Sequence, residues 1–309
     1  MPTHVVVGSG PIGSSVARGL AERGERVRMV TRSGKGPSHP LIELVAADAS
    51  DARRLTELTQ GAETLYNCAN PKYTEWEKLW FPMNDAMIAA AKAAGAVYVI
   101  TGNLYVYGPQ PGGHMTENSP LAAVGRKGKV RIQMWRDALA SGVRTVEVRG
   151  SDYIGAGAVG VFSYSILPAL NAGRAAYATA DPDLPHSFTY TGDMASTMIT
   201  LAHDERAWGK AWHTPTAPAI SIRELADRYC DFVGRPHLTI RKLPRAVMRT
   251  AGLFQPMARE LAEMDYQFYR PFHLDSSLTE RTFGLQASPI EVGIRETAED
   301  AQAIAARTM

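Results

Sequence analysis

The sequence predicts an α/β protein with a doubly wound parallel sheet and a smaller, mainly helical region towards its C-terminus. Three observations point to this fold class. A run of β-branched residues enters a glycine-rich turn and then a helical pattern, strands alternate with helices over two thirds of the chain, and arginine, methionine and aromatic residues are enriched near the end. We expect a sheet domain at 1–175, whose sheet is completed by residues of about 187–215. A smaller substrate-binding region is expected at 216–309, and loops from about 153–186 contribute to it.

The individual elements follow from apolar runs bounded by glycine and proline. The first strand precedes the glycine turn, and the first helix ends near Gly24. Further strands are expected at 27–30, 41–47, 64–69, 97–100, 143–148 and 211–214. Helices are expected at 51–61, 75–94, 129–140, 161–172 and 192–203. Ser221 and Glu224 form a capping box for another helix, which ends at Gly234.

Composition excludes several classes of function. The chain has 309 residues, is 45% hydrophobic, and scatters 33 basic and 31 acidic residues without long runs of one sign. We therefore expect neither a nucleic-acid nor a membrane partner. Cys68 and Cys230 are far apart, and the eight histidines lack a metal-ligand spacing, so neither a disulfide framework nor a metal site is predicted. No secretory leader precedes the first strand, and we expect a cytoplasmic protein.

The segment Gly8-Ser9-Gly10-Pro11-Ile12-Gly13 has the spacing G-x-G-x-x-G between a strand and a helix. In this context one glycine permits the tight turn, one lets backbone N–H groups approach a pyrophosphate, and one allows the helix to pack closely on the strand. The helix N-terminus then favours the anion. The segment predicts a dinucleotide site.

Residues after the second predicted strand bear on the choice of dinucleotide. An acidic residue that binds both ribose hydroxyls of NAD is expected there, but the sequence has Thr31-Arg32-Ser33. Arginine binds a phosphate bidentately, so the segment favours NADP over NAD. The alternative is that Arg32 is only a solvated loop residue.

Several later stretches add a family resemblance. They are Thr101-Gly102-Asn103-Leu104-Tyr105-Val106-Tyr107-Gly108-Pro109, the acidic loop 116–120, the segments 149–155 and 188–195, and the C-terminal segments 275–277, 284–285 and 288–297. Together they resemble the short-chain dehydrogenase/reductase superfamily in its extended or atypical branch, the NAD-dependent epimerase/dehydratase family. The resemblance implies a Rossmann fold.

The resemblance also assigns cofactor contacts. It places the pyrophosphate at Gly8, Gly10 and Gly13 with the intervening Ser9, Pro11 and Ile12, the 2′-phosphate at Arg32 with its neighbours, and the adenine amino group at Asp48 beside Ala49. Cys68, Ala69 and Asn70 would line the cofactor after the fourth strand, and Thr101 would join them at the end of the fifth.

The expected catalytic residues depart from the family pattern. Family members use a tyrosine as the acid, a lysine four residues later that holds the ribose, and a serine or threonine at the substrate oxygen. If Lys129 is that lysine, Gly125 occupies the tyrosine position, and Asn103 occupies the serine position. The cofactor half of the site is therefore present while the usual acid is missing.

Three interpretations of this departure remain open. The first is an NADP(H)-dependent oxidoreductase, a carbonyl or enone reductase, in which Tyr105, Tyr107 or Tyr153 is the acid, Lys129 holds the ribose and Asn103 polarises the carbonyl. The second is a redox-neutral epimerase or dehydratase. The third is a catalytically silent NADP(H)-binding regulator, resembling the nitrogen-metabolite-repression type.

Each candidate side chain also has a structural interpretation. Tyr105 and Tyr107 are equally explained as packing residues, and Lys127 and Lys129 as part of a solvated basic turn.

The last third of the chain supplies the expected substrate contacts. Its aromatic and methionine residues suit a small, partly apolar substrate, with Arg270 and His273 as polar contacts. Trp135, on the helix expected at 129–140, is either a core residue or the anchor of a possible homodimer.

Overall fold

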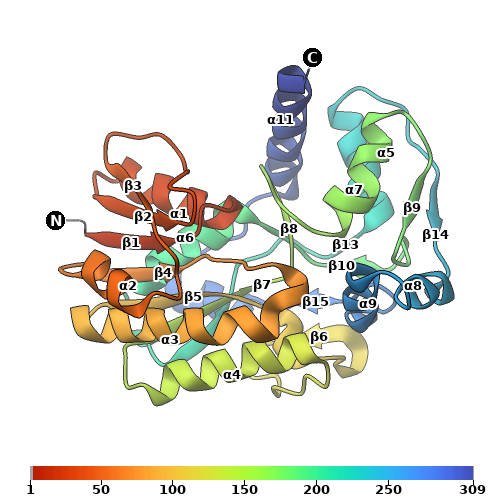
Figure 1. Cartoon of the computed structure of the whole chain (residues 1–309). Coiled ribbons are helices and arrows are strands. Elements are labelled where there is room, and N and C mark those ends of the chain that lie inside the picture. The colour runs from red at the N-terminus through yellow and green to blue at the C-terminus, as the bar shows by residue number, and fades with distance from the viewer. Residues whose placement is uncertain (1–2, 309) are drawn as a thin grey trace. The chain divides into compact units, whose positions relative to one another are not determined.

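Seven parallel strands form one sheet in the computed structural model, which describes residues 3–308 (Figure 1). In sheet order they are β3 (Ile42–Ala46), β2 (Val27–Thr31), β1 (His4–Val7), β4 (Thr64–Asn67), β5 (Val97–Asn103), β7 (Thr145–Gly150) and β12 (Lys210–His213). The order runs outwards from β1 in both directions. This confirms the predicted doubly wound α/β fold.

Five helices cover the two faces of this sheet. Figure 1 shows α1 (Pro11–Glu22) and α6 (Thr191–Ala202) on one face, and α2 (Ala52–Thr59), α3 (Trp76–Ala94) and α4 (Arg126–Ala140) on the other. Local signals explain their starts: Pro11 occupies the first turn of α1, and the Asp51 side chain accepts a hydrogen bond from the Arg54 N–H at the start of α2. Val5, Leu65 and Met87 are fully buried in the core beneath α2, α3 and α4.

The chain divides into two compact units. Unit 1 holds the sheet and comprises 3–108, 121–149 and 194–214; unit 2 comprises 109–120, 150–193 and 215–308. The units interleave along the chain, whereas the sequence analysis places its boundaries at 175 and 216. That the second region binds substrate stays a prediction.

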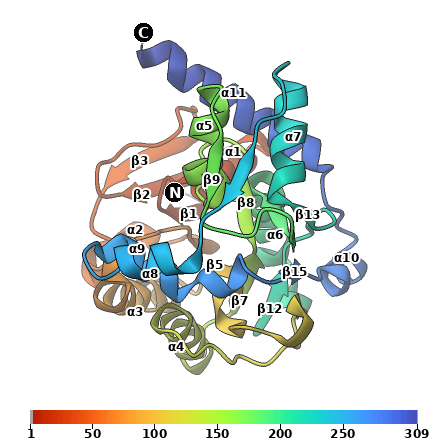
Figure 2. The ribbon, with the colours of Figure 1, turned by 90° about the vertical axis from the view of Figure 1, so that its right-hand side faces the viewer.

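Unit 2 combines helices with pairs of short strands. Its helices are α5 (Leu167–Asn171), α7 (Ile222–Phe232), α8 (Arg245–Ala251), α9 (Pro256–Glu263), α10 (Ser277–Phe283) and α11 (Ile290–Thr308). Its strands are β6 (His114–Met115), β8 (Asp152–Ile154), β9 (Ala176–Ala178), β10 (Pro185–His186), β11 (Phe188–Tyr190), β13 (Ile220–Ser221), β14 (Ile240–Lys242) and β15 (His273–Leu274). Figure 2 shows β9 beside β14 and α8 beside α9. None of the described helices of the chain is long and apolar enough to cross a membrane.

Two helices differ from the sequence expectation. The predicted helix 161–172 is a π-helical turn at Phe162–Ile166 followed by the short α5. More important for the site, α4 begins at Arg126, three residues before the predicted start, because Gly125 adopts an extended conformation and acts as its N-cap. This earlier start places Lys127 and Gly128 within α4.

A buried polar network lies at the end of β7 in unit 1. Glu147 and Arg149 are two residues apart on one strand and therefore project to the same face. The Arg149 guanidinium binds the Glu147 carboxylate at 2.8 and 2.5 Å and donates a hydrogen bond of 2.8 Å to the Tyr107 hydroxyl, which lies 2.7 Å from Nε2 of His213. Although burial by itself lowers it, the pKa of Arg149 is raised overall because Glu147 and the Tyr107 hydroxyl stabilise its charge.

Removing one member of this pair tests the network. Replacing Glu147 by alanine leaves a buried guanidinium without its counter-charge, which we expect to cost about 3–5 kcal/mol of unfolding free energy. Glu43→Ala is the matched control, since Glu43 pairs with Arg28 at the surface and should cost less than about 1 kcal/mol. Urea unfolding of both variants measures the difference, and equal costs would contradict this account.

Candidate cofactor and active site

A cavity of about 650 Å³ lies at the carboxyl-terminal edge of the sheet in unit 1. Crevices at this edge are where doubly wound sheets bind ligands. It is lined by Val7, Gly8, Ser9, Gly10, Val30, Thr31, Arg32, Ser33, Ala47, Asp48, Ala49, Ser50, Cys68, Ala69, Asn70, Pro71, Leu79, Pro82 and Met83. The structure therefore brings together four segments that the sequence analysis assigned separately to one dinucleotide.

The glycine turn has a different steric constraint at each glycine. Gly8 has φ +102°, and a β-carbon there would lie 2.6 Å from the Cys68 carbonyl oxygen; at Gly13 it would lie 2.1 Å from the Gly8 carbonyl oxygen. At Gly10 a β-carbon would meet no atom within 4 Å. Gly8 and Gly13 are thus required by the fold itself, whereas Gly10 leaves space that a ligand can enter.

The start of α1 is suited to an anion. Gly10 is the N-cap, no side chain caps the helix, and no acidic residue lies in its first turn. The N–H groups of this turn and the positive end of the helix dipole are thus available to a phosphate. Pro11, Ile12 and Gly13 form this first turn. These residues fit a dinucleotide pyrophosphate.

Polar residues surround the cavity at the ends of β2 and β3. Arg32 and Ser33 are exposed there, while the Thr31 hydroxyl is held in a turn by the backbone of Lys35. Asp48 accepts hydrogen bonds from the Ser50 N–H (2.9 Å) and hydroxyl (2.7 Å). These two bonds, with the Arg32 charge, lower the pKa of Asp48. An arginine and an ionised carboxylate therefore share this end of the cavity.

The loop after β4 forms the opposite wall. Cys68 is buried, and burial raises the pKa of its thiol to about 12, so it is a neutral packing group. Ala69 and the exposed Asn70 line the cavity beside it. Thr101, at β5, contacts the Met198 sulfur at 3.5 Å and is outside the cavity lining.

The three candidates that follow β5 have different environments. The Asn103 side chain accepts a hydrogen bond from the Tyr105 N–H (3.2 Å) and is half-buried. Tyr105 is also half-buried, with its hydroxyl 3.5 Å from that of Tyr73. Tyr107 is fully buried in the network with Arg149 and His213. Its hydroxyl is therefore engaged in the core of unit 1, which favours the packing interpretation of this residue.

The inward face of α4 carries Lys127 and Arg131 instead of Lys129. Lys129 is exposed, whereas Lys127 and Arg131 are 3% and 2% exposed. The Lys127 ammonium lies 3.9 Å from the centre of the Tyr73 ring and donates to the Tyr73 carbonyl oxygen at 2.5 Å. Arg131 donates to the Thr101 carbonyl oxygen and lies over the Trp80 ring. The two residues are four apart, the spacing of the tyrosine and lysine expected from the resemblance.

This pair is not apparent from the sequence, because the helix predicted at 129–140 begins after Lys127. Lys127, Gly128, Arg131, Met134 and Trp135 recur with a helical period on one face, and that signal is present in the sequence. Lys127 and Arg131 are charged, so this face does not match the periodic apolar pattern by which the buried side of a helix is usually identified. Gly128 is needed here, since a β-carbon would lie 2.5 Å from the Tyr105 carbonyl oxygen.

The remaining predicted residues belong to unit 2. Tyr153 lies on β8 and is half-buried, and Arg270 is exposed. His273 stacks on His114 with ring centres 4.5 Å apart. Burial, His114 and His186 together lower the pKa of His273. Their roles as substrate contacts stay predictions.

Solved structures with the same fold include several nucleotide-sugar enzymes. The Bordetella bronchiseptica enzyme WbmH in complex with NAD+ has a TM-score of 0.76 at 18% identity, covering 98% of this chain and 99% of that one. UDP-glucose-4-epimerase from Stenotrophomonas maltophila, with bound NAD and formylated UDP-arabinopyranose, has a TM-score of 0.78 at 18% identity. The alignment covers 99% of this chain and 100% of that one. dTDP-glucose 4,6-dehydratase from Bacillus anthracis str. Ames, in complex with NAD, has a TM-score of 0.78 at 15% identity. The alignment covers 98% of this chain and 97% of that one. A search of curated protein sequences finds no match.

A family model identifies the chain more directly. The model of the NAD dependent epimerase/dehydratase family matches residues 5–210, which include the glycine turn, the cavity and α4. The match covers two thirds of the sequence and includes the other six strands of the sheet, ending at the start of β12. The chain belongs to the NAD dependent epimerase/dehydratase family.

Proposed function

We propose that the chain is a redox-neutral enzyme of the epimerase or dehydratase type that acts on a nucleotide sugar with a bound nicotinamide dinucleotide, NADP in preference to NAD. The observation that carries this proposal is the single cavity formed by the glycine turn, Arg32, Asp48 and the Cys68 loop. Family membership and the likeness to nucleotide-sugar enzymes favour this reaction over the carbonyl or enone reduction that the sequence analysis put first.

Arg32 supports the NADP preference. It is exposed at the rim of the cavity and is close enough to Asp48 to lower the pKa of that carboxyl. A guanidinium in this position can bind a 2′-phosphate with two parallel hydrogen bonds. The solved relatives contain NAD, so the preference for NADP rests on Arg32 in this chain.

Replacing Arg32 by alanine tests the cofactor preference. Loss of one or two charge-assisted hydrogen bonds should weaken NADPH binding about tenfold to hundredfold and leave NADH affinity nearly unchanged. Calorimetric titration with both dinucleotides measures this ratio, and Arg136→Ala, an exposed arginine on α4, is the control. If the wild type binds NADH at least as tightly as NADPH, or the ratio is unchanged in Arg32→Ala, the preference is refuted.

The inward face of α4 supplies the residues for proton transfer in this proposal. A bound nicotinamide would accept a hydride from the substrate and return it within one turnover. Lys127 takes the role of acid and base that the family tyrosine has elsewhere, and Arg131, which is always charged, takes the positioning role of the lysine four residues later. Asn103 contributes a neutral donor near the end of β5. In this proposal Lys127 and Arg131 replace the earlier assignment of Lys129.

Substitutions at Lys127 distinguish proton transfer from a fixed positive charge. Lys127→Arg keeps the charge but cannot release its proton. We expect it and Lys127→Met to lower kcat about 10²-fold or more while dinucleotide affinity is retained. A panel of UDP- and dTDP-sugars, with products identified by NMR, provides the assay.

Lys129→Met is the matched control, because Lys129 is exposed on the same helix and its replacement should leave turnover unchanged. Full activity of Lys127→Arg would show that only charge matters at this position. Tight dinucleotide binding with no turnover of any sugar in the wild type would instead support the regulator. That alternative is kept because the usual tyrosine is absent.

A homodimer stays a prediction.

A further inference from the structure

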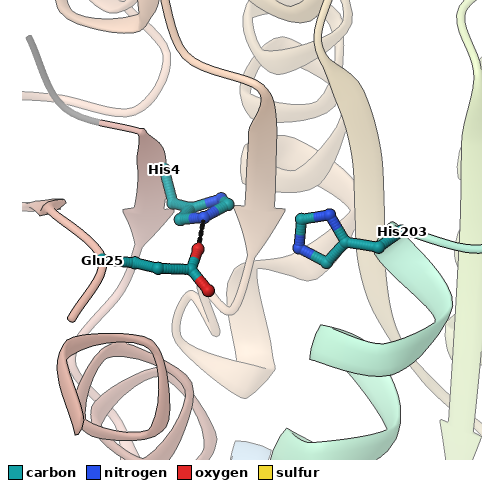
Figure 3. A group of neighbouring side chains, drawn as sticks. All are labelled: His4, Glu25 and His203. Atoms are coloured by element: carbon teal, nitrogen blue, oxygen red, sulfur yellow. Dashed lines mark hydrogen bonds and ion pairs between the residues drawn. The ribbon is translucent and has the colours of Figure 1, made fainter. Parts of the chain in front are cut away.

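Three side chains of the types that commonly bind metals lie together at the other end of β1, away from the glycine turn. His4 opens β1, Glu25 lies in the loop before β2, and His203 follows the last turn of α6. All three belong to unit 1. Figure 3 shows the His203 ring turned towards the His4 and Glu25 pair, whose hydrogen bond is dashed. One ligand atom from each residue lies within 4.8 Å of the others.

The donor set is chemically specific. Two imidazoles and one carboxylate are a ligand set of catalytic zinc sites, where water completes the tetrahedron. Imidazole also binds copper and nickel, whereas magnesium and calcium prefer oxygen ligands.

We propose that His4, Glu25 and His203 bind one zinc-like divalent transition-metal ion, with a fourth position open to solvent. A tetrahedral site with bonds of about 2.1 Å places its ligand atoms about 3.4 Å apart. The ligand atoms of His203 and of the hydrogen-bonded His4 and Glu25 lie within 4.8 Å of one another. Side-chain rotations that move these atoms by roughly 1–1.5 Å, with His4 and Glu25 separating, would give the tetrahedral spacing. Within the described residues, this is the single group of three or more such side chains with metal-binding geometry.

The environment of each residue suits this role. His4 is fully buried, the Glu25 side chain is 30% exposed, and His203 is exposed, so an ion can enter from the His203 side. His203 makes an edge contact with the His4 ring, with centres 5.6 Å apart, but its ring has no hydrogen bond to any described residue. The hydrogen bond between His4 and Glu25 gives His203 no function, whereas a metal site uses all three residues.

The consequence is a link between segments that are far apart in the sequence. The ion would join the first strand of the sheet to the end of α6, almost 200 residues later. Because β1 rises about 3.3 Å per residue, His4 is about 13 Å from Gly8 and the cofactor cavity. We therefore assign the site a stabilising role that is independent of the proposed catalytic function.

Metal binding is measured on the untagged, chelator-treated chain. We expect one equivalent of Zn²⁺ per chain after dialysis, by mass spectrometry of the metal, and a rise of several degrees in Tm with Zn²⁺ but not with Mg²⁺. His203→Ala is the discriminating variant. This variant leaves the hydrogen bond between His4 and Glu25 intact but should abolish both the bound zinc and the Tm shift.

The control is His39→Ala, a histidine in the loop before β3 that is outside the cluster. It should bind zinc like the wild type, and dinucleotide affinity should be equal in all variants. Absence of stoichiometric zinc in the wild type, or unchanged zinc binding in His203→Ala, would overturn the proposal. A loss of dinucleotide binding in His203→Ala would indicate general damage, and Glu25→Gln then provides the second test of zinc loss.

Discussion

The close approach of the glycine turn to the end of β4 is the constraint on which the cofactor site depends. Gly8 lies so near the Cys68 carbonyl that no side chain fits between them, and Gly13 lies equally close to Gly8. These contacts fix the path from β1 into α1 and leave the first N–H groups of that helix open. The cavity is therefore formed by backbone packing, and Gly10 keeps it accessible.

Burial of charge organises the other side of unit 1. Arg149 is hydrogen-bonded to Glu147 and to the Tyr107 hydroxyl, so a buried network connects the segment after β5 to β7. Such networks are costly when incomplete and rigid when satisfied. This engagement of its hydroxyl favours the packing interpretation of Tyr107, which lies in the same segment as Asn103 and Tyr105.

Features of the structure that depend on local sequence signals were predicted well. The G-x-G-x-x-G turn, the arginine after β2 and the alternation of strands and helices each depend on a few neighbouring residues, and they gave the fold class and the residues of the cavity. The start of α4 depends on the conformation of Gly125, which a glycine does not reveal in sequence. The helix predicted at 129–140 omits Lys127, so the sequence alone did not indicate that Lys127 and Arg131 share the inward face of α4. The role expected for Lys129 stays a prediction. Tyr107 could not be assigned either, because its partner His213 is more than a hundred residues away.

The cluster of His4, Glu25 and His203 is likewise not visible in the sequence, because its members are far apart along the chain. Short metal motifs place ligands on one turn or one helix face, and the histidines of this chain show no such spacing. His4, Glu25 and His203 are brought together by the parallel order of the sheet and by α6 packing beside α1, where Gly19 contacts Ile199. A doubly wound sheet gathers chain segments at both of its edges, and the carboxyl edge is the one that family motifs mark. Polar clusters at the opposite edge are therefore visible only once the fold is known.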